Sequence, residues 1–363
     1  MHPETVSARP SPARAGTLII VNPMSAGERP LTEDELLRAI RKVLSGPGPG
    51  VIVGVGDDAA VVKPGGGDGV LSTDMLVEGV HFDRALTSAR DLGSKAVVAN
   101  VSDIAAMGAS PRHALVSLAL SSDVEAPWVM ELFGGMLSAC EEYAMSLVGG
   151  DLSRGPAVVV SVAVVGEVAD GKAVTRAGAR PGQRLVVTGT LGGSAGGLAL
   201  ARAPVPKVGQ ALASEWGRAL LDMHFRPQAR VGEGQTLAQV GGGAMMDLSD
   251  GLSLDLSRLC AESAVGARVE LPAVPVTPEL RELARVIDID PLGLALSGGE
   301  DYELLATLSS ESVDDATRLV RERFGVTLTA IGEVTAGPDI VAVDESGNER
   351  PLLPRGWDHF AAR

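Results

Sequence analysis

Short apolar runs alternate along the chain with segments in which apolar residues return every three or four positions. The spacing of Leu36, Leu37, Ile40, Val43 and Leu44 is that of one helix face, whereas the alternation within 158–168 is typical of a strand. Because strands and helices follow each other in turn, the pattern predicts layered sheets and helices, an α/β (α+β) fold. Further predicted helices cover 88–108, 127–145 and 253–263, and further predicted strands cover 51–55, 69–76, 113–120, 184–190, 242–249, 267–271, 302–308 and 327–334.

Polar residues and prolines mark where three of these helices begin. Thr32 and Glu35 have the spacing of a capping box, and Ser88 and Asp91 repeat it before the second helix. Pro127 suits the first turn of the third helix. These boundaries depend only on neighbouring residues, so they are predicted more sharply than the packing between elements.

A turn-rich stretch, residues 169–183, divides the chain into two halves of similar layout. We place the boundary near residue 180, with an N-terminal domain over 31–180 and a C-terminal domain over 181–363. A chain of 363 residues has room for two cores of ordinary size. Residues 1–30, rich in Pro, Ser, Arg and Gly, are expected to form a flexible N-terminal extension.

Composition excludes several classes of protein. A net charge of −15 argues against a partner such as nucleic acid, which is held by basic surfaces. No apolar run approaches the ~20 residues of a membrane span, and the N-terminus lacks the pattern of a secretory signal. Cys140 and Cys260 are far apart in sequence and are expected to be reduced thiols, so the predicted location is the cytoplasm.

Carboxylates interrupt or follow the apolar segments at six places. Each one taken alone is most simply a helix cap or a turn residue, Asp250 before Gly251 above all. As a set they suggest oxygen ligands for a hard cation such as Mg²⁺, because buried carboxylates are usually paired or bound to metal. Five scattered His residues and no Cys pair do not support zinc. The six acids are Asp58, Asp74, Asp103, Asp151, Asp247 and Asp250.

No standard phosphate-binding loop is evident in the sequence. Neither a P-loop motif nor the catalytic-loop set of the protein kinases is present. The Gly-rich segment 188–200 opens a predicted helix, and it either cradles an anion at the helix start or allows helix and strand to pack closely. Arg154 and Arg176 are the cations best placed to meet a phosphate.

Three further residues each have a structural and a ligand-binding interpretation. His81 follows an apolar strand, and its simplest role is an imidazole bonded to a backbone carbonyl. Glu300 stands in a Gly-Gly turn, and Trp357 is either a core anchor or a flat surface for an aromatic ligand. None of the three decides a function by itself.

Seven motifs, in this order, resemble those of the thiamine-monophosphate kinase family. That family shares a superfamily with aminoimidazole ribonucleotide synthetase, selenophosphate synthetase and a hydrogenase-maturation dehydratase. The resemblance runs from about residue 32 to the C-terminus. The motifs are GVGDDAAVV (54–62), LSTDMLVEGVHF (71–82), KAVVANVSDIAAMGASP (95–111), LVGGDLSRGP (147–156), VTRAGARPG (174–182), MMDLSDGLSLDL (245–256) and LSGGEDYEL (296–304).

The resemblance implies the two-domain fold of aminoimidazole ribonucleotide synthetase, in which the N-terminal sheets of two chains join into a dimeric barrel. It implies phosphoryl transfer from ATP to thiamine monophosphate by a homodimer, with several Mg²⁺ ions as cofactors and ATP as co-substrate. In the first motif it selects Asp58 as a metal ligand and leaves Asp57 to shape the turn or to act from behind the metal ligands. Matched by motif, the metal ligands are Asp58, Ser72, Thr73, Asp74, Asp103, Asp151, Asp247 and Asp250, with Asp74, Asp151 and Asp250 as the catalytic acids; the ATP contacts are Gly150, Asp151, Arg176 and Ser249; and the substrate contacts are His81, Glu300 and Trp357.

Two other functions stay open on sequence grounds. One is an ATP-dependent enzyme of the same superfamily with a different acceptor, and the other is a non-catalytic sensor of nucleotide or thiamine phosphate. The row of acids favours an enzyme, because a sensor has less need for several cations. For the transfer we expect direct in-line displacement, since the acceptor phosphate is already ionised near pH 7, with a second pKa of ~6.

Overall fold

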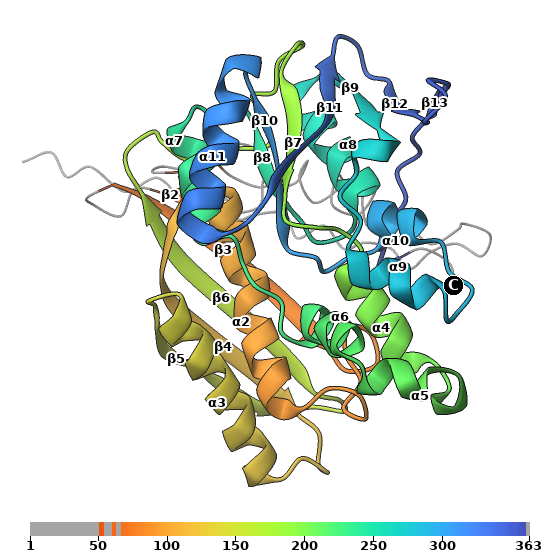
Figure 1. Cartoon of the computed structure of the whole chain (residues 1–363). Coiled ribbons are helices and arrows are strands. Elements are labelled where there is room, and N and C mark those ends of the chain that lie inside the picture. Colours follow the sequence, from red (N-terminus) through yellow and green to blue (C-terminus); the bar gives the residue numbers. More distant parts are fainter. Residues whose placement is uncertain (1–50, 54–59, 63–66, 361–363) are drawn as a thin grey trace, which may run out of the picture.

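The computed structural model describes residues 51–53, 60–62 and 67–360 (Figure 1). The predicted capping box at Thr32, the helix over 36–44, and Asp57 and Asp58 lie outside the described residues. The described chain forms two sheets, each covered by helices, which is the mixed α/β architecture that the sequence predicts.

The N-terminal sheet has six strands in the order β1-β2-β3-β6-β4-β5. Its long strands β3, β6 and β4 are antiparallel, whereas the edge strand β5 runs parallel to β4. The strands are β1 (Val51–Val53), β2 (Ala60–Val62), β3 (Asp68–Val77), β4 (Ser110–Leu120), β5 (Ser146–Arg154) and β6 (Val159–Val168).

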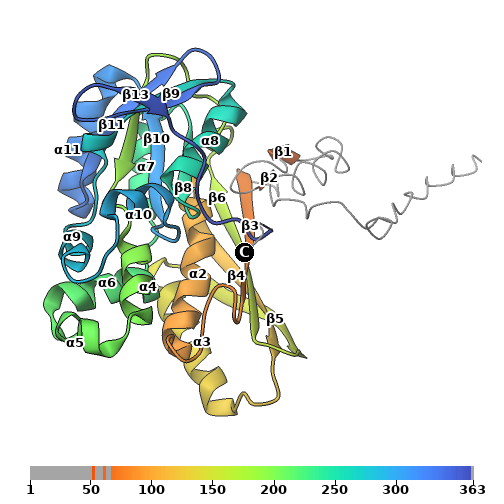
Figure 2. The same ribbon diagram turned by 90° about the vertical axis from the view of Figure 1, so that its right-hand side faces the viewer.

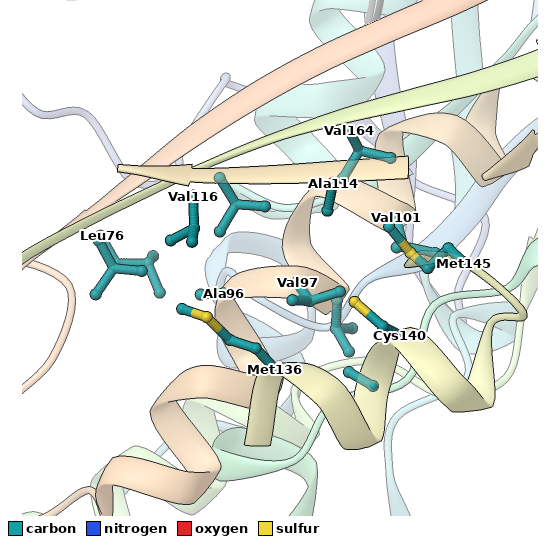
Figure 3. Close-up of a cluster of buried hydrophobic side chains, with 14 of the residues drawn as sticks. Leu76, Ala96, Val97, Val101, Ala114, Val116, Met136, Cys140, Met145 and Val164 are labelled. Carbon is teal, nitrogen blue, oxygen red and sulfur yellow. The ribbon is translucent and has the colours of Figure 1, made fainter. Parts of the chain in front are cut away.

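Two helices, α2 (Ala89–Ala106) and α3 (Ala126–Glu142), cover one face of this sheet (Figure 2). The predicted starts are confirmed: the Ser88 side chain accepts the N–H of Asp91 at 3.1 Å, and Pro127 lies in the first turn of α3. Apolar side chains of both helices and of the strands interdigitate between the layers (Figure 3). Most of α2 is buried, including the polar residues Lys95, Asn100 and Ser102.

The C-terminal sheet has seven strands in the order β13-β12-β9-β11-β7-β10-β8, antiparallel except where β12 pairs with β9. Helices pack around it and between it and α2 (Figure 1). The strands are β7 (Arg184–Thr188), β8 (Met245–Leu248), β9 (Gly266–Glu270), β10 (Glu303–Leu308), β11 (Leu328–Thr335), β12 (Ile340–Val343) and β13 (Glu349–Pro351); the helices are α4 (Gly193–Arg202), α5 (Val205–Ala213), α6 (Glu215–Phe225), α7 (Val231–Gln239), α8 (Leu252–Ser263), α9 (Pro278–Ala284), α10 (Pro291–Ser297) and α11 (Val313–Phe324).

The Gly-rich segment that opens α4 serves close packing. A Cβ on Gly197 would lie 2.1 Å from the carbonyl oxygen of Leu220 on α6. The N–H groups at the start of α4 are already bonded within the protein, because the Asp301 carboxyl group, whose pKa burial raises to about 7, accepts those of Gly192 and Ser194 at 2.7 and 3.1 Å. The close packing at this segment is therefore between helices and not between helix and strand as expected, and the N–H groups at the helix start bind a carboxyl group of the protein.

Both cysteines, Cys140 and Cys260, are free and buried, as predicted. Within the ranges that the structure describes, helices long and apolar enough to cross a membrane do not occur. The cytoplasmic location remains a prediction.

Candidate active site

A cavity of about 670 Å³ opens where the two halves of the chain meet. Its walls come from the end of β3 and the loop after it, from α2, α4 and α6, from the loops after β8 and α10, and from the C-terminal segment. Four of the predicted metal ligands line it, and the part of the wall that they form is called the acid end: Asp74 on β3, Asp103 on α2, Asp247 on β8 and Asp250 in the loop after β8.

Polar groups of α2 hold two of these acids in place. Asn100 Oδ1 accepts the backbone N–H of Asp74 at 2.8 Å, and Ser102 Oγ donates to Asp247 Oδ2 at 2.8 Å. Asp247 is itself buried in strand β8. One helix of the N-terminal half therefore fixes acids that belong to both halves.

The buried phenol of Tyr302 reports on the field of these acids. Its pKa is raised well above the ordinary value, first by burial and then by the negative charges of Glu300, Asp74, Asp247 and Asp103. The charges of these four carboxylates therefore all act on one buried side chain. The cavity is thus a region of concentrated negative charge.

Asp250 does not cap the helix that follows it, so that interpretation is wrong. The N-cap of α8 is Gly251, and the buried carboxylate of Asp255 accepts the backbone N–H groups of both Asp250 and Gly251 at 3.0 Å. Arg258 Nη1 lies 2.5 Å from Asp250 Oδ2 and 3.1 Å from Asp255 Oδ1. Burial, together with the charge of Asp250, raises the pKa of Asp255 to about 7.

The three predicted substrate contacts, His81, Glu300 and Trp357, line the same cavity, and the backbone N–H of Trp357 donates to the carbonyl oxygen of Asp250 at 3.1 Å. His81 Nδ1 accepts the backbone N–H of Val77 at 3.0 Å, so its strand-end partner is an N–H group and not the expected carbonyl. The rings of His81 and His359 lie 4.8 Å apart, and Trp357 Nε1 is 3.1 Å from His359 Nδ1. His359 was not among the site residues predicted from the sequence. The sequence feature that could have pointed to it is its position two residues after Trp357.

The loop that presents Glu300 is strained. Glu300 and Tyr302 both have positive φ angles, 65° and 51°, although neither is glycine. The Glu300 N–H donates to the carbonyl oxygen of Ser249 at 2.8 Å, which ties this loop to the loop of Asp250. Non-glycine residues in left-handed conformations persist where the surroundings enforce them and are frequent at functional sites.

Some predicted site residues lie outside this cavity. Asp58 is outside the described residues. Ser72 and Thr73 directly precede Asp74 on β3. The Ser72 hydroxyl donates to Asp103, whereas Thr73, on the opposite face of the strand, donates from Oγ1 to the carbonyl oxygen of Val162 at 3.0 Å. Ser72 therefore reaches the acid end through Asp103.

Arg176, in the turn-rich link, lies near the acid end without lining the cavity. Its carbonyl oxygen accepts a hydrogen bond from Ser263 Oγ at 2.7 Å, and its positive charge opposes the rise in the pKa of Asp255. The Arg176 guanidinium is thus beside the loop that carries Asp250 and Ser249, and Ser249 does line the cavity.

Gly150 and Asp151 lie on the edge strand β5, outside the cavity. Asp151 is in register with Ser117, which stands between the buried residues Val116 and Leu118 of β4. Since residues in register point to the same side of a sheet, Asp151 faces away from α2 and α3.

Asp74 points to the other face of the same sheet. It is in register with Val162, which pairs in turn with Val116, and both valines are buried under the helices. Strands β6 and β4 separate β3 from β5, and each spacing is about 4.8 Å. Within one chain, Asp151 and Asp74 are therefore too far apart to bind the same ion.

Comparison with known proteins identifies the family of this chain. The N-terminal and C-terminal domain models of the AIR synthase related proteins match residues 56–168 and 180–345. The thiamine-monophosphate kinase of Escherichia coli O157:H7 is 38% identical over 312 residues, which are 86% of this chain and 93% of that protein. The Aquifex aeolicus thiamine-monophosphate kinase is 35% identical over 306 residues, 84% of this chain and 92% of that protein. The chain belongs to the thiamine-monophosphate kinase family.

A solved structure of this family, AaThiL complexed with AMPPCP and TMP, has a TM-score of 0.78 and 34% identity, and covers 91% of this chain and 97% of that one. Membership makes the protein a kinase, an enzyme of the transferase class. Its two sheets with their helices are the two-domain fold of the AIR synthase related proteins.

The acid end fits Mg²⁺ by the chemistry of its donors. The groups available are carboxylate and hydroxyl oxygens, which are the ligands that Mg²⁺ prefers. In the part of the chain that the structure describes, however, three or more metal-type side chains do not form one ligand cluster. Mg²⁺ usually keeps waters and substrate phosphates among its ligands, so carboxylates spread around one cavity suit it.

Proposed function

We propose that this protein transfers the γ-phosphoryl group of ATP to the phosphate of thiamine monophosphate, giving thiamine diphosphate and ADP. The observation that carries this proposal is one cavity lined both by four acids, Asp74, Asp103, Asp247 and Asp250, and by His81, Glu300 and Trp357. A diphosphate-forming kinase needs such a cavity, since one end must manage phosphates and the other must recognise the organic part of the acceptor. The relative AaThiL was solved with AMPPCP and TMP together.

The difficulty of the reaction is the approach of two anions. Two unit charges ~4 Å apart repel by ~1 kcal/mol in water and by several kcal/mol at the effective dielectric of a protein site. Several Mg²⁺ ions would supply positive charge that offsets this repulsion, and within one chain Asp151 would bind a different ion from Asp74. The proposed ligands of these ions are Asp58, Ser72, Thr73, Asp74, Asp103, Asp151, Asp247 and Asp250.

We propose that residues of the chain position the phosphates. Asp74, Asp151 and Asp250 act as the catalytic acids, while Gly150, Arg176 and Ser249 contact ATP. The acceptor phosphate is already a nucleophile near neutral pH, so no residue has to remove a proton from it. The transfer is direct and in line, and His81 orients the acceptor without becoming phosphorylated.

We further propose that two chains pair through the uncovered face of the N-terminal sheet. Among the described residues no helix covers this face, and Leu71, Met75 and Leu115 on it are exposed (Figure 2). An apolar sheet face of this kind is typical of an interface. Asp151 lies on the same face, so pairing would move it from the surface of one chain to the junction of two.

An acceptor panel tests the proposed activity. The protein is incubated with Mg²⁺ and ATP and, in turn, with thiamine monophosphate, thiamine or AMP, and ADP release is measured. We expect release with thiamine monophosphate alone. Release with AMP or with unphosphorylated thiamine in its place would show that the acceptor is assigned wrongly.

A further inference from the structure

A buried ion pair joins α2 to the loop that carries Glu300. Lys95 Nζ donates to Glu300 Oε2 at 2.8 Å, although the two residues are 205 positions apart in the sequence. The Lys95 side chain is only 4% exposed, whereas that of Glu300 is 25% exposed and lines the cavity. The lysine is therefore behind the carboxylate, and the carboxylate faces the ligand space.

His224, at the end of α6, also contacts Glu300 Oε2, but it does not supply the positive charge beside this carboxylate. Its Nδ1 lies 3.5 Å from Glu300 Oε2 and 3.0 Å from Ser194 Oγ. Burial, and then the charge of Lys95, lowers the pKa of His224 to about 4, so the imidazole is neutral near pH 7. In the described ranges, Lys95 is thus the one cation in hydrogen-bond contact with Glu300.

Burial and Lys95 shift the pKa of Glu300 in opposite directions. Desolvation raises the pKa of the Glu300 carboxyl group, but the positive charge and the hydrogen bond of Lys95 bring it below its ordinary value. The left-handed backbone at Glu300 limits the directions in which its side chain can point. Lys95 therefore favours the ionised form of Glu300, and the backbone conformation restricts the orientation of its side chain.

We propose that Lys95 is a positioning residue that keeps Glu300 ionised and aimed into the cavity, and so sets the affinity for the organic part of the acceptor. This inference rests on the proposed function. An ionised carboxylate accepts N–H hydrogen bonds and attracts cations, and thiamine carries both an amino group and a cationic thiazolium ring. Lys95 does not touch the substrate in this account; it acts through Glu300.

Three lysine variants test the proposal by steady-state kinetics, with thiamine monophosphate and ATP varied separately. Lys95→Met should raise the KM for thiamine monophosphate by about tenfold or more, the effect of losing a hydrogen bond to a charged group, and should leave the KM for ATP unchanged. Lys95→Arg keeps the charge and should restore part of the affinity. Lys207→Met, on the exposed surface of α5, is the matched control and should change neither constant.

A second pair of variants separates positioning from a general structural role. Glu300→Gln should raise the same KM, and adding Lys95→Met to it should have no further effect, because Lys95 acts only through Glu300. The double variant holds no unpaired buried charge, so it keeps the test open if Lys95→Met does not fold. Calorimetric titration with thiamine monophosphate alone should give the same order of affinities without turnover.

Different results would overturn the inference alone and the proposed function. If the wild type forms thiamine diphosphate but Lys95→Met has an unchanged KM for thiamine monophosphate, the inference is wrong and the proposed function stands. An equal rise in both KM values, or a further loss in the double variant, would also overturn it. A wild type that neither binds nor phosphorylates thiamine monophosphate would overturn the proposed function together with the inference.

Discussion

Asp74 lies where the N-terminal sheet enters the cavity, and its side chain is exposed to that cavity. Its backbone, not its carboxylate, makes the contact with Asn100 that fixes the strand end. Asp74→Asn should therefore leave the melting temperature almost unchanged and lower kcat on the order of 10²-fold or more. Asp170→Asn, in an exposed turn, is the control that should keep full kcat. A variant at position 74 with near-normal kcat would exclude a role in phosphate handling.

His224 gives a second residue-scale prediction, for stability against pH. Its imidazole takes up a proton at about pH 6.5 in the unfolded chain but only at about pH 4 in the folded one, because it is buried. The unfolded state then binds more protons between these values, so this group makes stability fall as the pH drops from 6.5 to 4. His224→Gln should remove that slope: from pH 7 to pH 5 the wild type should lose about 2 kcal/mol more than the variant. Urea unfolding at the two pH values measures this, and parallel slopes would contradict it.

At the scale of elements, α2 and α3 pack through glycine. A Cβ on Gly135 would lie 1.8 Å from the carbonyl oxygen of Arg90 on α2, whereas a Cβ on the neighbouring Gly134 would meet only the flexible end of the Arg90 side chain at 2.9 Å. Gly135→Ala should cost about 1–3 kcal/mol of unfolding free energy through overpacking. Gly134→Ala should be neutral or mildly stabilising, because alanine favours a helix. Equal effects in urea unfolding would mean that this contact does not set the helix spacing.

The elements were predictable where their cause is local. The cap at Ser88, the proline in the first turn of α3 and the alternation in β6 depend on adjacent residues, and the structure confirms all three. Contacts that depend on distant residues were not predictable. Asp255 takes the backbone N–H groups near Asp250, where the sequence suggested that Asp250 itself was a cap.

The candidate site likewise has residues that the sequence could predict and contacts that it could not. Its acids and Glu300 stand in short motifs, so sequence could nominate them, and the cavity brings most of them together. The pairing of Lys95 with Glu300 joins positions 205 apart, and no local pattern signals it. The face on which Asp151 lies also required the register of β4 and β5, which a bulge shifts between Ala114 and Leu115.

The whole molecule is expected to be a pair of chains, and Leu115 tests this. Leu115 is 46% exposed on the uncovered face of the N-terminal sheet, beside the row that contains Asp151. Leu115→Glu would place a charge in an apolar interface and should convert a dimer to a monomer with reduced kcat. Analytical ultracentrifugation measures the mass. Val205→Glu, at a 66% exposed position on α5, is the control that should remain dimeric. If the wild type is a monomer at assay concentrations, or Leu115→Glu keeps its mass, this face is not the interface.

In the proposed reaction, the acids of the cavity serve phosphoryl transfer to thiamine monophosphate through bound Mg²⁺. Chromatographic detection of thiamine diphosphate tests this directly, in mixtures of the protein, ATP and thiamine monophosphate with Mg²⁺ present or with a chelator in excess. We expect one thiamine diphosphate per ADP with Mg²⁺, none with the chelator, and recovery when Mg²⁺ is restored. ADP release without thiamine diphosphate, or full activity in the chelator, would contradict it.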